Sequence, residues 1–261
     1  MSTSPSAAGL ASGEAASASV GPELVVGGLT SLSTVDWPGE LAAVVFCQGC
    51  AWSCPYCHNA ALRPFGPNGG DSGPPYAGRP WPDVLHWLET RRGLLDAVVF
   101  SGGEPLLQPG LPGAMATVRG LGFKTGLHTS GMNPAALARA LPLCDWVGLD
   151  IKAPRAAYDR ITGRPGSAKA AWQSLELLRK SGAAFELRTT WHPALLSEAE
   201  LLALAAELSG VAGVEWRLQA FQPDGCEDLS LAAAGRVHAP QTLATALRRA
   251  LGAGGSLTVR D

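Results

Sequence analysis

The chain has 261 residues, of which 46% are hydrophobic and 16% are charged, and its formal net charge is −2. This length and apolar content suit one large α/β domain, or two small ones, with a substantial core, and they argue against a disordered chain. The nearly balanced charge predicts no strongly basic face, so nucleic acid is not expected as a primary partner. No apolar run approaches the roughly 18 residues of a membrane span, so no membrane association is expected.

Residues 1–22 form a segment rich in Ala, Ser and Gly that contains neither Lys nor Arg. We expect this segment to be a disordered tail, followed by a single domain over residues 23–261. The tail lacks the basic region and apolar core of a secretion signal. We therefore expect a cytoplasmic protein, in a reducing compartment of the kind that free thiolate ligands also need.

From residue 41 onward, short apolar runs alternate with helical patterns. The runs are rich in Val, Leu, Phe and Trp, which is typical of buried parallel strands, and they cover Leu41–Phe46, Asp96–Phe100, Phe123–Leu127, Trp146–Leu149, Phe185–Thr189 and Glu215–Leu218. Helices are predicted over Trp81–Arg92, Leu111–Leu121, Pro134–Leu141, Ala168–Lys180, Ser197–Leu208 and Pro240–Leu251, and a short strand over Leu257–Arg260. Ser197 and Glu200 suit a capping box, and a loop rich in Gly and Pro spans residues 66–80.

Six βα units predict an α/β fold with a partial, open parallel (β/α)6 barrel, because two units are missing from the eight of a closed barrel. A flat doubly wound sheet is the competing architecture, and the period of the pattern does not separate the two.

Four cysteines follow the first predicted strand, and three of them, Cys50, Cys54 and Cys57, have the spacing C-x3-C-x2-C. Structural zinc sites use four ligands in two closely spaced pairs, and no second pair lies downstream. Three thiolates on one loop instead suit an iron–sulfur cluster in which one iron lacks a protein ligand and is free to bind a substrate or cofactor. Cys47 ends a strand and is interpreted as a core thiol, with a fourth ligand as the alternative.

Polar residues stand where the other predicted strands end, at the edge where the active sites of parallel barrels lie. These residues are Ser101, Gly102, Gly103 and Glu104; His128, Thr129 and Ser130; Asp150 and Lys152; Glu186, Arg188 and Thr190; and Gln219 and Gln222.

Each of these residues also has a purely structural interpretation. Gly102 and Gly103 suit either a simple turn or a close backbone approach to a ligand, with Glu104 accepting a hydrogen bond from an ammonium group. Asp150 and Lys152 suit an ordinary ion pair or a site for a carboxylate. His128 is interpreted as a buried, hydrogen-bonded histidine. Arg188 is expected to bind a carboxylate or to pair with Glu186. Cys144 and Cys226 are expected to be small buried apolar groups.

The cysteine spacing, with Tyr56 before the last cysteine and Gly-Gly-Glu-Pro at the next strand end, resembles the radical S-adenosylmethionine superfamily. Within it, Ser33-x-x-Asp36-Trp37-Pro38-Gly39 and Cys57-His58-Asn59 resemble activators of glycyl radical enzymes. Asp150-Ile-Lys152-Ala-Pro and Arg188-Thr-Thr190 resemble the subgroup that activates anaerobic ribonucleoside-triphosphate reductase.

This resemblance implies one 4Fe–4S cluster on Cys50, Cys54 and Cys57, with S-adenosylmethionine on the open iron. It implies cofactor contacts from Tyr56, Asn59, Gly102, Gly103, Glu104, Thr129, Ser130, Asp150, Lys152 and Arg188. Reduced flavodoxin or ferredoxin would supply the electron that splits the cofactor into methionine and a 5′-deoxyadenosyl radical. That radical would take a hydrogen atom from a glycine of the partner enzyme, so no catalytic acid or base is expected in the chain.

The chain departs from the pattern at His128-Thr-Ser130-Gly131, where related activators often have Asp-Thr-Asn-Gly. In some relatives that Asp helps to bind a monovalent cation beside the cofactor. A neutral histidine is a poor ligand for such a hard ion, although Asp150 remains. Only Cys144 and Cys226 lie outside the motif region, so no second cluster is expected.

Two other functions remain open on the sequence. One keeps the radical chemistry but acts on another glycyl radical enzyme, a small molecule or a peptide. The other is a structural zinc protein or an electron carrier without enzymatic activity.

Overall fold

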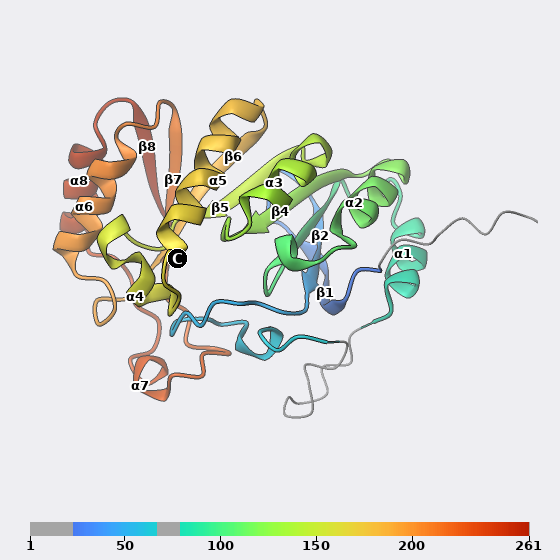
Figure 1. The fold of residues 1–261 in the computed structure, drawn as a ribbon, viewed down its shortest axis with the longest axis horizontal. Coiled ribbons are helices and arrows are strands. Elements are labelled where there is room, and N and C mark those ends of the chain that lie inside the picture. Colours follow the sequence, from blue (N-terminus) through green and yellow to red (C-terminus); the bar gives the residue numbers. More distant parts are fainter. Residues whose placement is uncertain (1–22, 67–78, 261) are drawn as a thin grey trace, which may run out of the picture.

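Eight strands follow one another across a single sheet in the order of the chain in this computed structural model, which describes residues 23–66 and 79–260 (Figure 1). The predicted tail, and all but the ends of the predicted loop at residues 66–80, lie outside the described residues. The strands are β1 (Val26–Ser33), β2 (Ala42–Cys47), β3 (Ala97–Gly102), β4 (Lys124–Thr129), β5 (Trp146–Asp150), β6 (Ala184–Trp191), β7 (Val214–Ala220) and β8 (Gly255–Arg260).

The sheet is parallel from β2 to β8, and β1 pairs with β2 in the antiparallel sense. Over the described residues, β1 and β8 form the two edges and do not pair with each other, so the sheet stays open. The predicted open α/β barrel is confirmed. The prediction missed β1, whose sequence includes Gly27 and Gly28 and gives a weak strand signal.

The longer helices cover the outer face of the sheet, and α7 lies away from it (Figure 1). The helices are α1 (Trp81–Glu89), α2 (Leu111–Gly120), α3 (Pro134–Ala140), α4 (Tyr158–Thr162), α5 (Ser167–Ser181), α6 (Glu198–Leu208), α7 (Leu229–Ala232) and α8 (Gln241–Leu251). The capping box predicted at the start of α6 is present, with the Ser197 hydroxyl accepting from the Glu200 amide at 3.2 Å. The short α4 and α7 were not predicted. In the part of the chain that is described, no helix has the length and apolar content needed to span a bilayer.

The amino-terminal end of the barrel is closed by Trp37, from the loop between β1 and β2. Its ring stacks on Trp146 with 5.5 Å between ring centroids, and it packs with Ala42 and Ala97 in a small apolar cluster. Ala42, Ala97 and Trp146 are the first residues of β2, β3 and β5. Trp37 therefore fills the end of the barrel that lies opposite to the carboxyl ends of the strands. Any cavity inside the barrel therefore opens toward the carboxyl ends.

Candidate functional site

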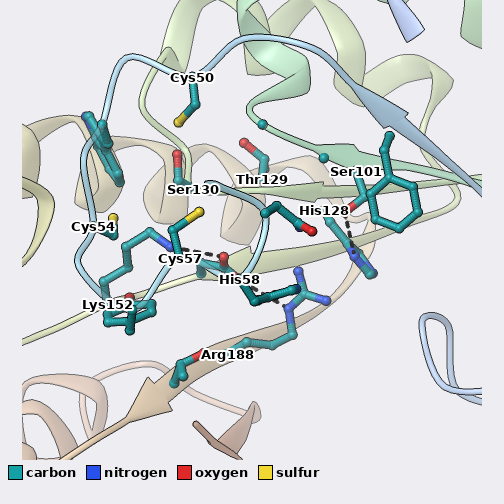
Figure 2. Close-up of a pocket in the computed structure, with 18 of the residues that line it drawn as sticks. Cys50, Cys54, Cys57, His58, Ser101, His128, Thr129, Ser130, Lys152 and Arg188 are labelled. Atoms are coloured by element: carbon teal, nitrogen blue, oxygen red, sulfur yellow. Dashed lines mark hydrogen bonds and ion pairs between the residues drawn. The ribbon is translucent and has the colours of Figure 1, made fainter. Parts of the chain in front are cut away.

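A cavity of about 360 Å³ lies at the carboxyl ends of the strands, between them and the loop that carries the cysteine motif (Figure 2). Its size falls within the range of small-molecule sites. The structure brings together nearly all of the predicted site residues around it, namely Cys50, Cys54, Tyr56, Cys57, Asn59, Gly102, Gly103, Thr129, Ser130, Asp150, Lys152 and Arg188.

The cysteine loop crosses the end of the sheet and is held by backbone hydrogen bonds at two points. The Cys50 amide donates a 2.9 Å hydrogen bond to the Arg63 carbonyl, which closes the loop on itself. The Ser53 amide donates a 2.9 Å hydrogen bond to the carbonyl of Thr162, the last residue of α4. These bonds hold the cysteine loop over the cavity without any metal.

Three of the four motif cysteines face the cavity. Cys54 is buried, Cys50 and Cys57 are half-buried, and all three line the cavity. Cys47 ends β2, is fully buried and belongs to the apolar core, as its interpretation as a core thiol requires. Burial raises the pKa of the Cys50 thiol to about 12, with the Glu104 charge as a smaller cause. A metal is therefore needed to hold this sulfur as a thiolate near neutral pH.

The three thiols are too dispersed for one metal ion. Among the described residues, no group of three His, Cys, Asp or Glu side chains gathers closely enough to hold a single ion. A cluster binds each cysteine to a different iron, so it suits cysteines spread around a cavity, whereas a zinc ion draws its ligands to about 2.3 Å. The donor set is consistent with a 4Fe–4S cluster and argues against a structural zinc site.

Gly102 and Gly103 place the end of β3 against the cysteine loop. A Cβ at Gly102, where φ is +112°, would lie 2.4 Å from the Cys47 amide nitrogen. A Cβ at Gly103 would lie 2.4 Å from the Gly49 carbonyl oxygen. The expected close approach is thus made to the protein's own backbone, although both glycines also line the cavity.

Glu104 differs from its expected place, since its side chain does not line the cavity and is only 1% exposed. Its Oε1 accepts from the Thr129 hydroxyl at 2.6 Å and the Leu106 amide at 3.0 Å. Its Oε2 accepts from the Ser130 amide at 2.9 Å and from the Ser130 hydroxyl. The carboxylate is saturated by these donors, so it binds the end of β4 to the end of β3 rather than an ammonium group.

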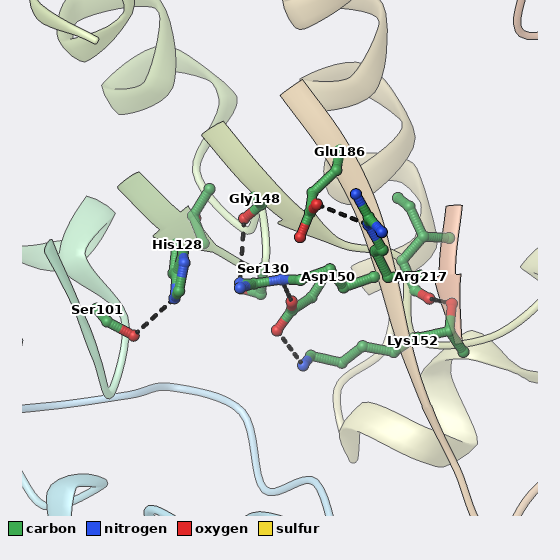
Figure 3. A network of polar contacts seen from close by, with 12 residues as sticks. Ser101, His128, Ser130, Gly148, Asp150, Lys152, Glu186 and Arg217 are labelled. Carbon is green, nitrogen blue, oxygen red and sulfur yellow. Dashed lines mark hydrogen bonds and ion pairs between the residues drawn. The ribbon is translucent and has the colours of Figure 1, made fainter. Parts of the chain in front are cut away.

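Asp150, Lys152 and Arg188 form an ion network on the cavity wall. The Lys152 ammonium lies 3.2 Å from Asp150 Oδ2 (Figure 3). Arg188 Nε lies 3.1 Å from Asp150 Oδ1. Burial would raise the pKa of the Asp150 carboxyl, but Lys152 and Arg188 outweigh it and lower that pKa. Arg188 therefore pairs with Asp150, and Glu186 pairs instead with Arg217 at 2.9 Å.

His128 is a buried, hydrogen-bonded histidine, as predicted. Its Nε2 lies 2.7 Å from the Asp36 carbonyl oxygen, which only accepts, and its Nδ1 lies 3.3 Å from the Ser101 hydroxyl. Nε2 must therefore carry the proton, and Ser101 donates to Nδ1. Burial lowers the pKa of His128 well below its usual range, and the Arg188 charge lowers it further. His128 is neutral at pH 7.

Aromatic side chains complete the cavity wall. The Tyr56 hydroxyl is buried and finds no hydrogen-bond partner among the described residues, and the Lys152 ammonium lies 5.6 Å from the centre of the Tyr56 ring. Sequence reasoning missed Phe46 and Trp52 and gave no role to His58, although all three line the cavity. Ala42, Val44 and Phe46 are alternate residues of β2 and therefore share one face of the strand. This pattern would have predicted that Phe46 points into the barrel.

The segment that follows β7 packs against the outside of the cysteine loop. Cys226 is half-buried and packs against the apolar core, and its thiol also donates to the Pro55 carbonyl at 3.2 Å. Glu227 pairs with Arg63 at 3.2 Å, beyond the end of the cysteine loop. These contacts support the cysteine loop on the side away from the barrel.

Comparison with known proteins gives a consistent family assignment. The family model for the radical SAM superfamily matches residues 44–191. A protein of Methanocaldococcus jannaschii, named as a candidate glycyl-radical enzyme activating enzyme, is 27% identical over 225 residues, covering 78% of this chain and 82% of its own length. A pyruvate formate-lyase-activating enzyme of Clostridium pasteurianum is 33% identical over 142 residues, covering 52% of this chain and 56% of its own length.

Solved structures match at the level of the fold. A radical SAM methyltransferase from Sphaerobacter thermophilus superposes with a TM-score of 0.57 and 18% identity, over 85% of this chain and 67% of its own. Streptococcus suis SuiB, solved with its precursor peptide SuiA, superposes with a TM-score of 0.56 and 11% identity, over 82% of this chain and 47% of its own.

Proposed function

The chain belongs to the radical SAM superfamily, whose members use a 4Fe–4S cluster and S-adenosylmethionine, and from this premise we propose that it generates a glycyl radical on a partner enzyme. The observation that carries the proposal is the cavity in which three thiols, the Gly102–Gly103 turn and the charged network of Asp150, Lys152 and Arg188 meet. Cys50, Cys54 and Cys57 would hold the cluster, which together with S-adenosylmethionine would supply the radical chemistry needed to take a hydrogen atom from a glycine.

The chain's own residues bind and orient. Cys50, Cys54 and Cys57 hold the cluster at the rim of the cavity. Lys152 and Arg188 offer positive charge for the cofactor carboxylate, and Thr129 and Ser130 are fixed by their hydrogen bonds to Glu104. Groups fixed in this way lose little freedom when the cofactor binds. Tyr56 and Asn59 cover the cavity from the cysteine loop and limit the access of water.

A protein substrate is supported by two observations. The two relatives described above are named as activating enzymes, one for glycyl radical enzymes and one for pyruvate formate-lyase. The sheet also stays open between β1 and β8 over the described residues, and a protein substrate is proposed to approach from this side.

For the partner we propose anaerobic ribonucleoside-triphosphate reductase, because the segments at Asp150–Pro154 and Arg188–Thr190 resemble that subgroup. Pyruvate formate-lyase is the second candidate, since relatives 33–36% identical carry that name. A small molecule or peptide is the third. Reduced flavodoxin or ferredoxin is the proposed electron donor.

The test uses the full chain, reconstituted anaerobically with iron and sulfide and reduced with dithionite. We expect 5′-deoxyadenosine on adding S-adenosylmethionine, and we expect Cys54→Ala to abolish it while Cys47→Ala retains it. The reverse result would mean that Cys47, and not Cys54, is a ligand. A protein that retains tightly bound zinc and takes up no iron would end the radical proposal.

The partner is identified by adding each purified candidate enzyme to the same mixture. A glycyl radical signal in the EPR spectrum with the reductase alone supports the first candidate, and a signal with pyruvate formate-lyase alone supports the second. Cleavage of S-adenosylmethionine without a signal from either enzyme would favour a small molecule or peptide.

A further inference from the structure

A guanidinium group is built into the wall of the cofactor cavity. The Arg188 side chain is 8% exposed, its Nε donates to Asp150 Oδ1 at 3.1 Å, and its Nη2 donates to the Gly148 carbonyl at 3.4 Å. The pairing of β5 with β6 sets Asp150 directly opposite Arg188. The position of the guanidinium is thus determined by the sheet register and by two acceptors.

Gly148 makes the space that this guanidinium occupies. A Cβ at Gly148 would lie 2.8 Å from Arg188 Cζ, closer than side-chain carbons approach one another. The backbone of Gly148 shows no positive φ, so the absence of a side chain, and not backbone conformation, is what the site requires. Gly148 and Arg188 are therefore matched to each other.

Apart from Asp36 Oδ1, the oxygen atoms named below are engaged by donors. Asp150 Oδ2 accepts from Lys152, and the Ser101 hydroxyl donates to His128 (Figure 3). The other ring nitrogen of His128 donates to the Asp36 carbonyl. The Asp36 carboxylate accepts from Ser33 through Oδ2, and its Oδ1 lies 3.8 Å from His128. A hard monovalent cation needs several oxygen ligands, and His128 supplies none.

The charges of the network also disfavour a bound cation. Lys152 and Arg188 contribute two positive charges, against the negative charges of Asp150 and of Asp36, which also lines the cavity. Both oxygens of Asp150 are paired with these two side chains, so they offer little attraction to an additional cation. The residues present therefore do not fit the monovalent cation site of related activators.

We propose that the Arg188 guanidinium takes the place of the Na⁺ or K⁺ that related activators bind beside the cofactor, so that this protein binds S-adenosylmethionine without a metal cation. The proposal rests on the assignment of the cofactor and not on the identity of the partner enzyme. The test of this proposal measures the binding of S-adenosylmethionine. If the protein fails to activate any partner enzyme, the proposal about the cation is therefore unaffected.

The experiment measures the Kd of S-adenosylmethionine for the reconstituted protein in NaCl, KCl and tetramethylammonium chloride at equal ionic strength. We expect the three Kd values to agree within about twofold, because screening is then the same in all three salts. A Kd that improves about tenfold or more with added K⁺, and saturates, would overturn the proposal.

Variants at Arg188 and His128 sharpen the test. Arg188→Gln should weaken cofactor binding about 10- to 100-fold in every salt, which corresponds to losing a charge-assisted hydrogen bond. The double variant His128→Asp, Arg188→Gln restores a carboxylate and frees the Asp150 and Gly148 oxygens. We expect K⁺ to improve its binding by about tenfold, and an absence of any K⁺ response in the folded double variant would count against the proposal.

Arg217→Gln is the matched control, because Arg217 pairs with Arg188 in the register of β6 and β7 but contacts Glu186 instead of Asp150. It should show no K⁺ response. If the double variant fails to fold, Arg188→Ala replaces it, with methylguanidinium as the added probe. Rescue of cofactor binding by methylguanidinium but not by K⁺ supports the proposal, and rescue by K⁺ alone contradicts it.

Discussion

At the scale of single residues, two glutamates and one cysteine show how far a residue type predicts a role. Glu104 has the sequence context of a ligand-binding carboxylate, yet its four hydrogen bonds all go to the protein. Glu186 was a candidate partner of Arg188 but lies beside Arg217. Cys226 was expected to be a small buried apolar group, and it packs against the core while its thiol also contacts the cysteine loop. In each case the residue type limits the possible partners, and the fold selects among them.

Replacing Glu104 by Gln is expected to destabilise the protein by about 1–3 kcal/mol, because an amide cannot accept from Thr129 and Ser130 with both of its polar atoms. Urea unfolding of the chain without cofactor measures this loss. Glu176→Gln is the control, since Glu176 forms only an exposed pair with Arg179 and should change stability by less than about 0.5 kcal/mol. Equal stability of the two variants would contradict the structural role of Glu104.

At the scale of elements, the cysteine loop is a segment supported from two sides. The end of β3 reaches it through Gly102 and Gly103, and the segment after β7 reaches it through Gly225 and Cys226. A Cβ at Gly225, where φ is +74°, would lie 2.0 Å from the His58 carbonyl oxygen. The cysteine ligands are thus positioned by packing between elements that are distant in the sequence.

Gly225→Ala is expected to push the segment after β7 away from the cysteine loop and to speed the loss of iron from the reconstituted protein to a chelator by about tenfold or more. Gly235→Ala is the matched control. Gly235 also has a positive φ, of +68°, but a Cβ there meets no atom within 4 Å. The two variants share backbone strain, so equal rates of iron loss would show that the contact with His58 does not matter.

At the scale of the whole molecule, the barrel is closed at one end and open along one side. Trp37 and Trp146 fill the amino-terminal end, while the sheet remains open between β1 and β8 over the described residues. Gly126 accommodates this arrangement, since a Cβ there would lie 2.9 Å from the Trp37 ring. The closed end confines the chemistry to the carboxyl ends of the strands.

Trp37→Ala would leave a cavity beneath the site and is expected to cost about 3–5 kcal/mol of unfolding free energy. Thermal and urea unfolding measure this cost. Trp87→Ala on α1 is the control, because Trp87 is only half-buried and its loss should cost clearly less. Similar losses for the two variants would mean that the Trp37–Trp146 stack does not close the barrel.

The sequence alone indicated the parallel strands from β2 onward and the three cysteines that face the cavity. These features depend on local apolar periodicity and on spacing within one loop, which a single sequence displays, whereas periodicity left the open barrel and a flat doubly wound sheet as alternatives. Polar residues at successive strand ends also predicted most of the cavity wall, because parallel strands bring their carboxyl ends to one edge.

Only the tertiary structure decided which polar groups meet. The pairing of Asp150 with Arg188, the saturation of Glu104, the place of Trp37 inside the barrel and the support of the cysteine loop by Cys226 depend on contacts between residues far apart in the chain. Such contacts follow from sheet register and from the space that Gly126 and Gly148 leave. The physical reason is that packing and hydrogen-bond saturation are properties of the assembled barrel, and no short segment carries them.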